Sequence, residues 1–287
     1  MRSKKDSFLY PIWEKLESNL SEEFALNELA FFSTYSPWHF HRLFSQFQSE
    51  NVKDYVRRLR LEKAAFEIKT TSFPILEIAL EAGYTSQEAF TKAFRKTLGI
   101  TPAAYRKKFQ TNPKNFGGLL ALEPFGISSA DICIKKISSF HLLYRRRIGP
   151  YHEMPGFPED PTFLSAIYEW LSKQKHSAHD QKWIGISQDD PDITEPDKIR
   201  FDIGIPVSPK IQVPHGLGLQ RVEGGDRVQI RVRLPYDSLP KVYEVIINEF
   251  FPKFHRRLAN LAPFEVYLKR EPRDAIVTDL YFALRDS

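Results

Sequence analysis

The sequence contains a single cysteine, Cys133, among its 287 residues. One thiol cannot close a disulfide within the chain, and it excludes a zinc site built from several cysteines. Long apolar runs are missing too: no stretch reaches the roughly 20 residues of a membrane-spanning helix. The charged start of the chain lacks the apolar segment of a secretory signal. We therefore expect a cytoplasmic protein with no membrane partner.

Common signatures of catalytic and metal sites are also missing. The chain has no glycine-rich phosphate-binding loop, no Gly-x-Ser-x-Gly and no HExxH segment. His39 and His41 stand two residues apart, so on a helix they would point in different directions. Asp189, Asp190 and Asp192 lack the glycine and the distal glutamate of a calcium loop, and we expect a solvated turn. The sequence predicts no metal, no cofactor and no enzymatic activity.

Two kinds of residue pattern divide the chain. Up to about Gln110 apolar residues recur at helical spacing, and then come residues that stop helices and form loops. Beyond about Asp131 the pattern is mixed, with helices at Thr162–Lys175 and Ser238–Phe250. Alternating residues predict strands at Phe140–Ile148, Arg200–Val207, Val228–Leu234, Pro263–Lys269 and Val277–Leu284. We predict an all-α domain at 1–112, which holds most of the basic excess, a linker at 113–130 and an α+β domain at 131–287.

Two segments of the first domain resemble each other and predict a pair of helix-turn-helix units. Ala30–Phe44 and Ala79–Phe94 each contain the end of a helix, a short turn and a serine before a second helix. Ser36 and Ser86 suit the N-cap, where the hydroxyl accepts a bond from an otherwise unpaired backbone N–H. A long helix over Asp54–Lys69 would join the units. The alternative is two amphipathic hairpins in another helical bundle.

The second helix of each unit would have an apolar and a polar face. The apolar stripes are Phe40, Leu43, Phe44 and Phe47 in the first helix, and Phe90, Ala93, Phe94 and Leu98 in the second. The polar faces are Trp38, His41, Arg42 and Ser45, and then Gln87, Glu88, Thr91, Lys92 and Arg95. A helix in the major groove needs such a face, with donors for base edges and phosphates near its N-terminus.

Residues from about 8 to 109 resemble the DNA-binding domain of the AraC/XylS family of transcription regulators. The matching stretches are Ser36–Phe44, Tyr55–Ala64, Ile78–Tyr84 and the closing motif Phe94–Arg106. The resemblance implies two units that read successive major-groove segments of double-stranded DNA, with RNA polymerase as a further candidate partner. By this match the DNA-contacting residues would be Trp38, His41, Arg42, Gln87, Glu88, Thr91 and Lys92. Glu88 departs from the small or amide residues common at its position.

The second domain contains an internal repeat. Arg145–Tyr151 parallels Arg231–Tyr236, and each is followed by a helix and then a closing strand. The order strand, helix, strand, strand therefore occurs twice, which predicts a pseudo-twofold domain with a cleft between its halves. Clefts of this kind commonly hold ligands.

The last strand offers candidate ligand-binding residues. Alternation would put Leu280, Phe282 and Leu284 against helices, and Asp279, Tyr281 and Ala283 on the other face, toward the cleft. A carboxylate beside aromatic rings suits a cationic or amine-bearing ligand. The predicted ligand residues are Tyr151, Tyr236, Asp279 and Tyr281. Two alternatives stay open: a solvated Asp279 on an exposed strand edge, or an acidic ligand for Arg145, Arg147, Arg231 and Arg233.

From Ile132 to Leu284 the chain resembles the GyrI-like (gyrase-inhibitor-like) effector-binding domains found behind AraC-type DNA readers. Leu142–Tyr151, Asp189–Asp192 and Phe201–Val207 carry the match. In such domains a cleft-lining glutamate on the final strand engages the ligand, and Asp279 is the matching position. The fold expected is thus an all-α double helix-turn-helix domain followed by a duplicated α+β GyrI-like domain that senses a small amphipathic, aromatic molecule.

Two other functions remain open for the second domain. Some GyrI-like domains hydrolyse small reactive compounds, and Asp279 with Tyr281 or Tyr151 could act as general base and acid. The domain could instead bind a protein such as a topoisomerase. The attached DNA reader favours sensing over both.

Overall fold

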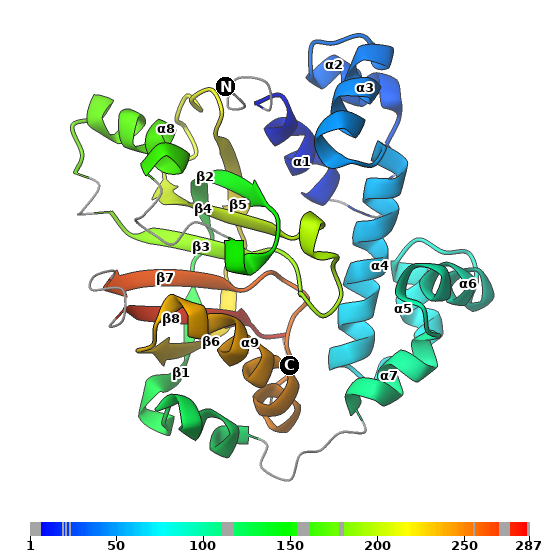
Figure 1. Ribbon diagram of the computed structural model, residues 1–287, viewed down its shortest axis with the longest axis vertical. Helices are drawn as coiled ribbons and strands as arrows, with labels where there is room; N and C mark the ends of the chain where they lie inside the picture. Colours follow the sequence, from blue (N-terminus) through cyan, green and yellow to red (C-terminus); the bar gives the residue numbers. More distant parts are fainter. Residues whose placement is uncertain are drawn as a thin grey trace. The chain divides into compact units, whose positions relative to one another are not determined.

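The computed structural model describes residues 7–18, 20, 22, 24–110, 118–153, 161–177, 181–254, 256–269 and 276–285. The chain divides into two compact units, Met1–Gln110 and Thr111–Ser287 (Figure 1). Within the described ranges, no helix combines the length and the apolar character that crossing a bilayer would require.

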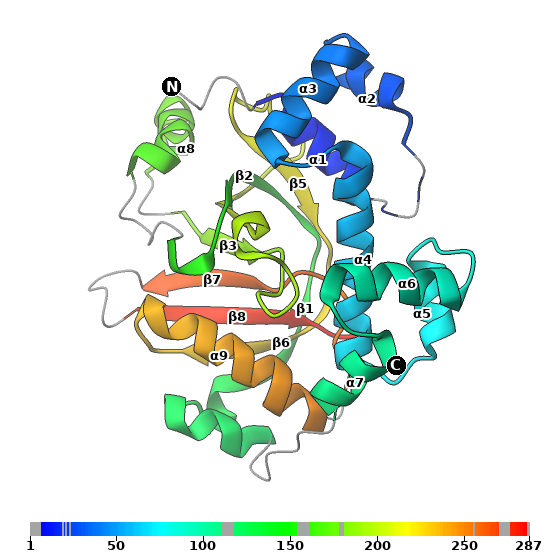
Figure 2. The same ribbon diagram turned by 45° about the vertical axis from the view of Figure 1, so that its right-hand side comes forward.

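The described part of the first unit contains helices and turns and no strand. Its longest helix, α4 (Val52–Thr70), lies between two groups of helices (Figures 1 and 2). The helix predicted at Asp54–Lys69 is therefore confirmed, and Asn51 caps it by accepting a bond from the backbone N–H of Asp54 at 3.0 Å. The two groups are α1 (Leu9–Ser18), α2 (Leu26–Phe32) and α3 (Pro37–Gln48), and then α5 (Ile75–Glu81), α6 (Gln87–Leu98) and α7 (Pro102–Gln110).

Helices α3 and α6 begin and end in the same way. The hydroxyl oxygens of Ser36 and Ser86 accept bonds from backbone N–H groups three residues later, at 3.4 and 3.1 Å, so both predicted N-caps are confirmed. The residues after the two helices, Ser49 and Gly99, are both left-handed, with φ of 58° and 78°. Glycine adopts this conformation without strain, whereas serine does not.

Aromatic side chains form the core on each side of α4. Phe40 and Phe44 of α3 are fully buried, and so are Phe90 and Phe94 of α6. The ring of Phe44 lies 5.6 Å from that of Tyr55 on α4, so it fixes the first group of helices to the long helix. Leu43 and Phe47, also predicted for the apolar stripe of α3, are half-buried at its margin.

Arg60 of α4 holds segments from both groups of helices. Its guanidinium donates to the backbone oxygens of Leu20 at 2.5 Å and Glu22 at 3.0 Å. On the other side it lies against Gly83, in the turn between α5 and α6. Gly83 has φ of +81°, and a β-carbon there would come within 2.9 Å of the Arg60 guanidinium. The turn therefore requires glycine for its conformation and for the close approach of the arginine.

The second unit is built on one antiparallel sheet. Its described residues form eight strands in the order β1-β6-β8-β7-β3-β4-β2-β5. The predicted strands Phe140–Ile148 and Arg200–Val207 have the bounds of β2 and β4, and the other three differ from β6, β7 and β8 only at their ends. The strands are β1 (Ile132–Ile137), β2 (Phe140–Ile148), β3 (Trp183–Ser187), β4 (Arg200–Val207), β5 (Gly218–Val222), β6 (Gly225–Val232), β7 (Phe264–Lys269) and β8 (Val277–Ala283).

The strand order is mirrored about the neighbours β7 and β3. On one side of this centre come β8 and then β6, and on the other come β4 and then β2. In each half a short 3-10 helix and an α-helix follow the outer of these strands. They are η4 (Tyr151–Glu153) and α8 (Pro161–Lys173) after β2, and η7 (Tyr236–Ser238) and α9 (Leu239–Val245) after β6.

Alternation along the strands gives the sheet two faces. The face that α8 and α9 cover, here called the helix face, carries Leu280 and Phe282 of β8. The ring of Phe282 lies 5.4 Å from that of Tyr243 on α9, which confirms that this side of the last strand packs on helices. On the opposite face Phe140 of β2 lies 5.8 Å from Phe264 of β7, although β3 and β4 intervene. The sheet therefore curls around this opposite face into a half-barrel.

The range 113–130, predicted as a linker, contains helical segments. A 3-10 helix, η2 (Gly118–Phe125), buries Ala121 and Leu122 and packs against α9. It also contacts η8 (Ile246–Phe250), a π-helical turn that continues α9. A second 3-10 helix, η3 (Ser129–Asp131), leads directly into β1. Residues 118–130 are therefore part of the second unit's structure, because apolar residues of η2 complete its core.

Candidate functional site

Helix α3 presents the three residues predicted to contact DNA on one exposed surface. Trp38 is 72% exposed, and His41 and Arg42 are exposed as well. The Arg42 guanidinium lies over the Trp38 indole, 5.2 Å from the ring centre, with one nitrogen 3.4 Å from Nδ1 of His39. Attraction between the cation and the ring orients the arginine away from the core. The Arg42 guanidinium therefore lies on the exposed surface of α3.

Helix α6 presents the corresponding surface of the second group. A hollow on this surface is lined by the four predicted residues Gln87, Glu88, Thr91 and Lys92, and also by Arg95, Lys96 and Thr101. Glu88 lies in the first helical turn, where the helix dipole favours an acid, and four residues before Lys92, the favourable order for such a pair. These interactions stabilise α6, so they explain an acid at position 88 without any contact with a base.

The replacement Arg42→Ala is expected to weaken specific DNA binding by about 1–3 kcal/mol and to relax preference at one base position. Lys53→Ala removes one charge from an exposed position outside α3. It should lower affinity at most slightly and leave sequence preference unchanged. Binding to a randomised duplex library, with selected sequences read out for the wild type and both variants, measures the two effects. Equal preference in the wild type and Arg42→Ala would remove Arg42 from the set of reading residues.

The helix face of the sheet holds a buried carboxyl group among tyrosines. Glu265 of β7 is 4% exposed, and its two oxygens accept bonds from the hydroxyls of Tyr243 at 3.0 Å and Tyr267 at 2.7 Å. The Tyr236 ring lies 5.7 Å from that of Tyr267. The pKa of the Tyr151 hydroxyl is raised, first by burial and then by the charge of Asp189, and the charge of Glu265 adds to the same shift. Glu265 and these four tyrosines are called the Glu265 cluster.

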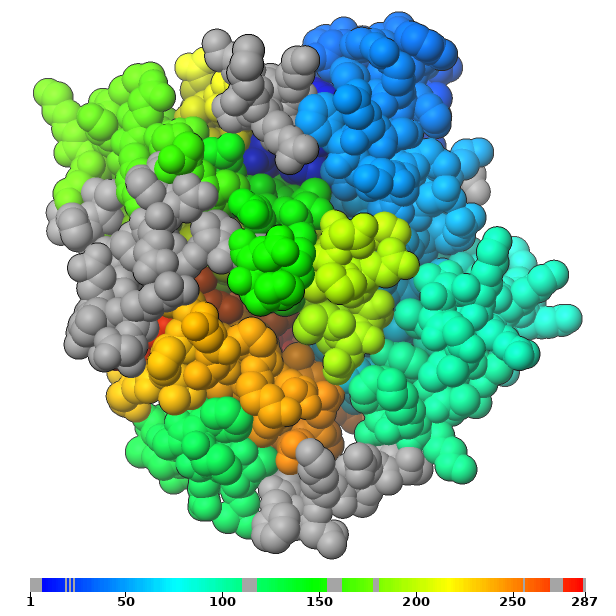
Figure 3. Space-filling view, viewed as in Figure 1, coloured from blue at the N-terminus to red at the C-terminus, as the bar shows by residue number. Residues whose placement is uncertain are grey.

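Figure 3 shows a hollow between α9 and η4, with atoms in the red colours of the last strands at its floor. Tyr243 belongs to α9 and Tyr151 to η4, so two residues of the Glu265 cluster come from the elements that border this hollow. Tyr151, Tyr236 and Tyr243 are half-buried, whereas Glu265 and Tyr267 are buried. The three tyrosines are therefore partly accessible to solvent, whereas Glu265 and Tyr267 are not.

A glycine makes room for the cluster. Gly185 of β3 stands directly across from Glu265. A β-carbon at Gly185 would overlap the Tyr267 hydroxyl and approach the Phe201 ring to 2.8 Å. Any larger residue would displace the hydroxyl that bonds to Glu265.

Burial governs the electrostatics of the cluster. It raises the pKa of the Glu265 carboxyl, although hydrogen bonds from Tyr267 and Tyr243 act in the opposite direction. The pKa values of Tyr243 and Tyr267 are also raised, first by burial and then by the charge of Glu265. The ionised carboxylate is therefore less stable here than in water, and no cationic side chain among the described residues contributes to its pKa. A cationic ligand could supply the missing charge.

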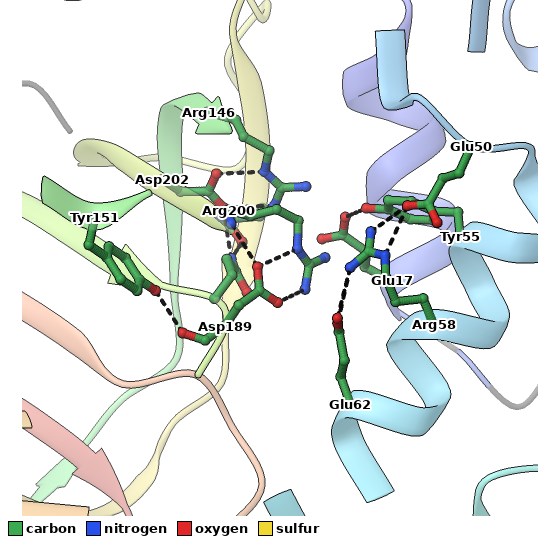
Figure 4. Close-up of polar contacts among 12 residues, drawn as sticks. Glu17, Glu50, Tyr55, Arg58, Glu62, Arg146, Tyr151, Asp189, Arg200 and Asp202 are labelled. Atoms are coloured by element: carbon green, nitrogen blue, oxygen red, sulfur yellow. Dashed lines mark hydrogen bonds and ion pairs between the residues drawn. The ribbon is translucent and has the colours of Figure 1, made fainter. Parts of the chain in front are cut away.

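On the opposite face, arginines and aspartates form paired contacts (Figure 4). Arg146 of β2 binds Asp202 of β4 through two bonds of 2.7 and 2.8 Å. Arg231 of β6 binds Asp279 of β8 with the same two distances. Each pair joins residues directly across from each other in the sheet. Arg146 and Arg231 each stand five residues before a tyrosine, Tyr151 and Tyr236.

The structure brings two of the four predicted ligand residues together and separates them from the others. Tyr151 and Tyr236 belong to the Glu265 cluster on the helix face, whereas Asp279 and Tyr281 project from the opposite face. Asp279 is 3% exposed and is held by Arg231, so the alternative of a solvated aspartate is wrong. The ring of Tyr281 stacks on Phe264 at 4.7 Å.

Two further residues differ from the expectation. Glu265 was missed, although the alternation Phe264-Glu265-Val266-Tyr267 already placed it beside Tyr267 on one strand face. Asp189, expected in a solvated turn, has a side chain only 3% exposed that is paired with Arg200 at 2.6 Å. Its backbone oxygen accepts a bond from the Tyr151 hydroxyl at 2.8 Å (Figure 4). Asp189 therefore holds the Tyr151 hydroxyl through its backbone oxygen.

Comparisons with known proteins recognise both units. Residues 130–285 match the GyrI-like small molecule binding domain family, and residues 29–108 match a helix-turn-helix domain family. The chain is similar to the HTH-type transcriptional activator AarP of Providencia stuartii, with 35% identity over 39% of this chain and 79% of AarP. It is also similar to the transcriptional regulator Rob of Salmonella typhimurium, with 30% identity over 55% of this chain and 58% of Rob. The solved DNA-binding domain of AdpA, in complex with a target DNA, shares 26% identity over 36% of this chain and 93% of that domain, with a TM-score of 0.34.

The two matches together cover most of the described chain and define a DNA-binding transcription regulator with a domain for small molecules. The chain belongs to the AraC/XylS family of regulators and carries a GyrI-like domain as its second unit. The chain spans somewhat more than half of Rob's length, and 32% of the right origin-binding protein of Escherichia coli.

Proposed function

We propose that this regulator binds an operator through α3 and α6, and that a small molecule bound at the Glu265 cluster controls its action there. The DNA contacts would come from the exposed residues of the two helices, Trp38, His41, Arg42, Gln87, Glu88, Thr91 and Lys92, joined by Arg95 and Lys96. The regulator would act in the cytoplasm, where it meets chromosomal DNA. A contact with RNA polymerase stays a prediction.

The ligand we propose is an amphipathic molecule with an aromatic ring and a cationic or amine group. The observation that carries this proposal is the buried Glu265 carboxyl group, bonded only to tyrosine hydroxyls among the described residues. A cation placed there would stabilise the ionised carboxylate and lie against aromatic rings, which attract cations. Tyr151 and Tyr236 keep their predicted role, and Glu265 takes the role predicted for Asp279.

We also propose that the second unit consists of two copies of one strand-helix-strand-strand motif. The mirrored strand order supports this, as do the equivalent pairs Arg146–Asp202 and Arg231–Asp279. Tyr151 and Tyr236 each follow a proline at the start of the 3-10 helix in their half. The Glu265 cluster would then lie on the pseudo-twofold axis and receive one such tyrosine from each copy.

We propose that the domain is a sensor and does not hydrolyse its ligand through Asp279. That aspartate is engaged by Arg231 on both oxygens and projects from the face opposite Tyr151. A general base needs a carboxylate oxygen available to a proton of the substrate or of a water. A protein partner such as a topoisomerase stays an untested alternative, for which the described residues offer no specific support.

The replacement Glu265→Gln tests the ligand site, with 2-naphthylmethylammonium as the probe. We expect the Kd of the Glu265→Gln variant for this aromatic cation to be about 10-fold to 100-fold higher than that of the wild type, because the variant keeps the shape of the site and removes its charge. The neutral analogue 2-naphthylmethanol should bind the wild type and the variant equally. Calorimetric titration of the full chain measures both ligands.

Asp279→Asn is the matched control, because it removes the charge of the other candidate acid. It should leave the Kd for the aromatic cation unchanged. A large loss of affinity in Asp279→Asn with none in Glu265→Gln would return the site to the opposite face.

The pH dependence of stability gives a second readout. Because the pKa of Glu265 is raised, the contribution of this group to stability is present at acid pH and is lost as pH rises through the raised pKa. Glu265→Gln should lack this contribution, so the difference in stability between the two proteins should change with pH.

A further inference from the structure

Arg227 of β6 is a buried arginine with no acidic partner among the residues that the structure describes. Its side chain projects from the face of the sheet opposite the helices and is 1% exposed. One guanidinium nitrogen, Nη2, donates to the backbone oxygen of Glu223 at 2.8 Å. The other two nitrogens, Nε and Nη1, are buried without a hydrogen-bond partner in the part of the chain that the structure describes. Burial lowers the pKa of Arg227 to about 10.

Three other arginines on this face each have an aspartate as a partner. Arg146, Arg200 and Arg231 each bind an aspartate through two nitrogens, at distances of 2.6–2.9 Å. Their partners are Asp202, Asp189 and Asp279. In the mirrored half of the sheet, the position equivalent to Arg227 is Leu142. Arg227 is therefore an additional charge that the repeated pattern does not explain.

The charges nearest to Arg227 in the sheet do not compensate it. Its neighbour across β1 is Lys135, an exposed cation, and its neighbour across β8 is Ala283. Asp226, the preceding residue, pairs with Arg256 at 2.7 Å. Two like charges directly across from each other are destabilising, and an unpaired buried charge costs several kcal/mol. An anion beside Arg227 would remove both penalties.

Aromatic rings adjoin the guanidinium. Arg227 lies over the ring of Phe264, 4.8 Å from its centre. Phe264 stacks on Tyr281 at 4.7 Å with an angle of 17° between the rings, and Phe140 meets it edge-on at 5.8 Å. Ala283 adds only a methyl group to this surface. An aromatic ring joined to an acidic group is therefore complementary to the buried rings and the charge that lie here side by side.

We propose that Arg227 anchors a binding site for an aromatic carboxylate on the face of the sheet opposite the Glu265 cluster. The carboxylate oxygens accept bonds from the unpaired nitrogens of Arg227, and the ring lies beside Phe264 and Tyr281. A planar carboxylate matches a planar guanidinium, as the three aspartates on the same face illustrate. The ligand enters along β1, the edge strand across from Arg227, where Cys133 and Lys135 are exposed. This site is separate from the proposed sensor site and differs from it in charge.

The test measures thermal unfolding of the full chain at constant ionic strength with probes that share one ring. We expect 2-naphthoate at millimolar concentration to raise Tm by about 2–4 °C, because it binds only the folded state. Acetate carries the charge without the ring, and 2-naphthylmethanol carries the ring without the charge, so both should shift Tm less. A larger shift with inorganic phosphate than with 2-naphthoate would overturn the carboxylate assignment.

Arg227→Met should abolish the response to 2-naphthoate, whereas Arg231→Met, which removes an arginine with its own aspartate, should retain it. Without ligand, Arg227→Met should melt above the wild type, because it removes an unpaired buried charge. If Arg227→Met does not fold, Arg227→Gln serves in its place. An equal shift in the wild type and the Arg227 variant, or no shift in the wild type, would overturn the proposal. The Glu265→Gln variant should respond to 2-naphthoate as the wild type does, so failure of either site can be recognised separately.

Discussion

Phe44→Ala is expected to lower the free energy of unfolding of the first unit by about 3–5 kcal/mol. The Phe44 side chain is fully buried and contacts Phe40 and Tyr55, so its removal leaves a cavity between α3 and α4. Because α3 is one of the two helices that we propose to contact DNA, DNA binding should be lost as the unit unfolds. Urea denaturation of the full chain, followed by circular dichroism, measures the change in stability.

His41→Ala, on the exposed side of the same helix, is the matched control. It should change stability by less than about 0.5 kcal/mol and should still alter DNA binding. If Phe44→Ala and His41→Ala gave the same change in unfolding, the assignment of buried and exposed faces of α3 would be wrong.

Asp202→Ala is expected to destabilise the second unit by about 3–5 kcal/mol, because it leaves the Arg146 guanidinium buried without its acid. The side chains of both residues are almost completely buried, at 1% and 0% exposure. Gln188 and Gln220 also donate to the same aspartate, at 2.7 and 3.0 Å, so the loss extends to two amides. Urea denaturation of the full chain again provides the measurement.

The equivalent pair in the other half is the control. In Asp279→Ala the remaining arginine, Arg231, has a side chain 37% exposed, so water can solvate it. The loss of stability should be clearly smaller than in Asp202→Ala. The double variant Arg146→Met with Asp202→Leu should recover most of the lost stability, since neither residue then leaves a charge. Equal effects at Asp202 and Asp279 would contradict the argument from burial.

Local features of the fold could be predicted from the sequence. The caps at Ser36 and Ser86 depend on a serine and the few residues that follow it, so they are recognisable without tertiary contacts. The bounds of β2 and β4 follow from alternation within each strand. The exposed residues of α3 and α6 follow from helical spacing in the same way, and the family resemblance added the order of the two domains.

The candidate ligand site could be predicted only in part, because it depends on contacts between distant segments. Tyr151 and Tyr236 were found through the repeat, but Glu265 is buried by α9 and by neighbouring strands, which alternation within β7 does not reveal. Asp279 carries the acidic character that the resemblance required. Its partner Arg231 is 48 residues away, and only the pairing of β6 with β8 brings them together.

The ends of α3 and α6 have a consequence for the evolution of the chain. Ser49 adopts the left-handed conformation that Gly99 adopts at the equivalent point of the second unit. A serine there is strained relative to glycine by about 1 kcal/mol. Replacing Ser49 by glycine would remove this strain but would also raise the entropy of the unfolded chain, so the net gain in stability is small. Selection for stability therefore hardly distinguishes the two residues at this point, and each helix-turn-helix unit can keep its own.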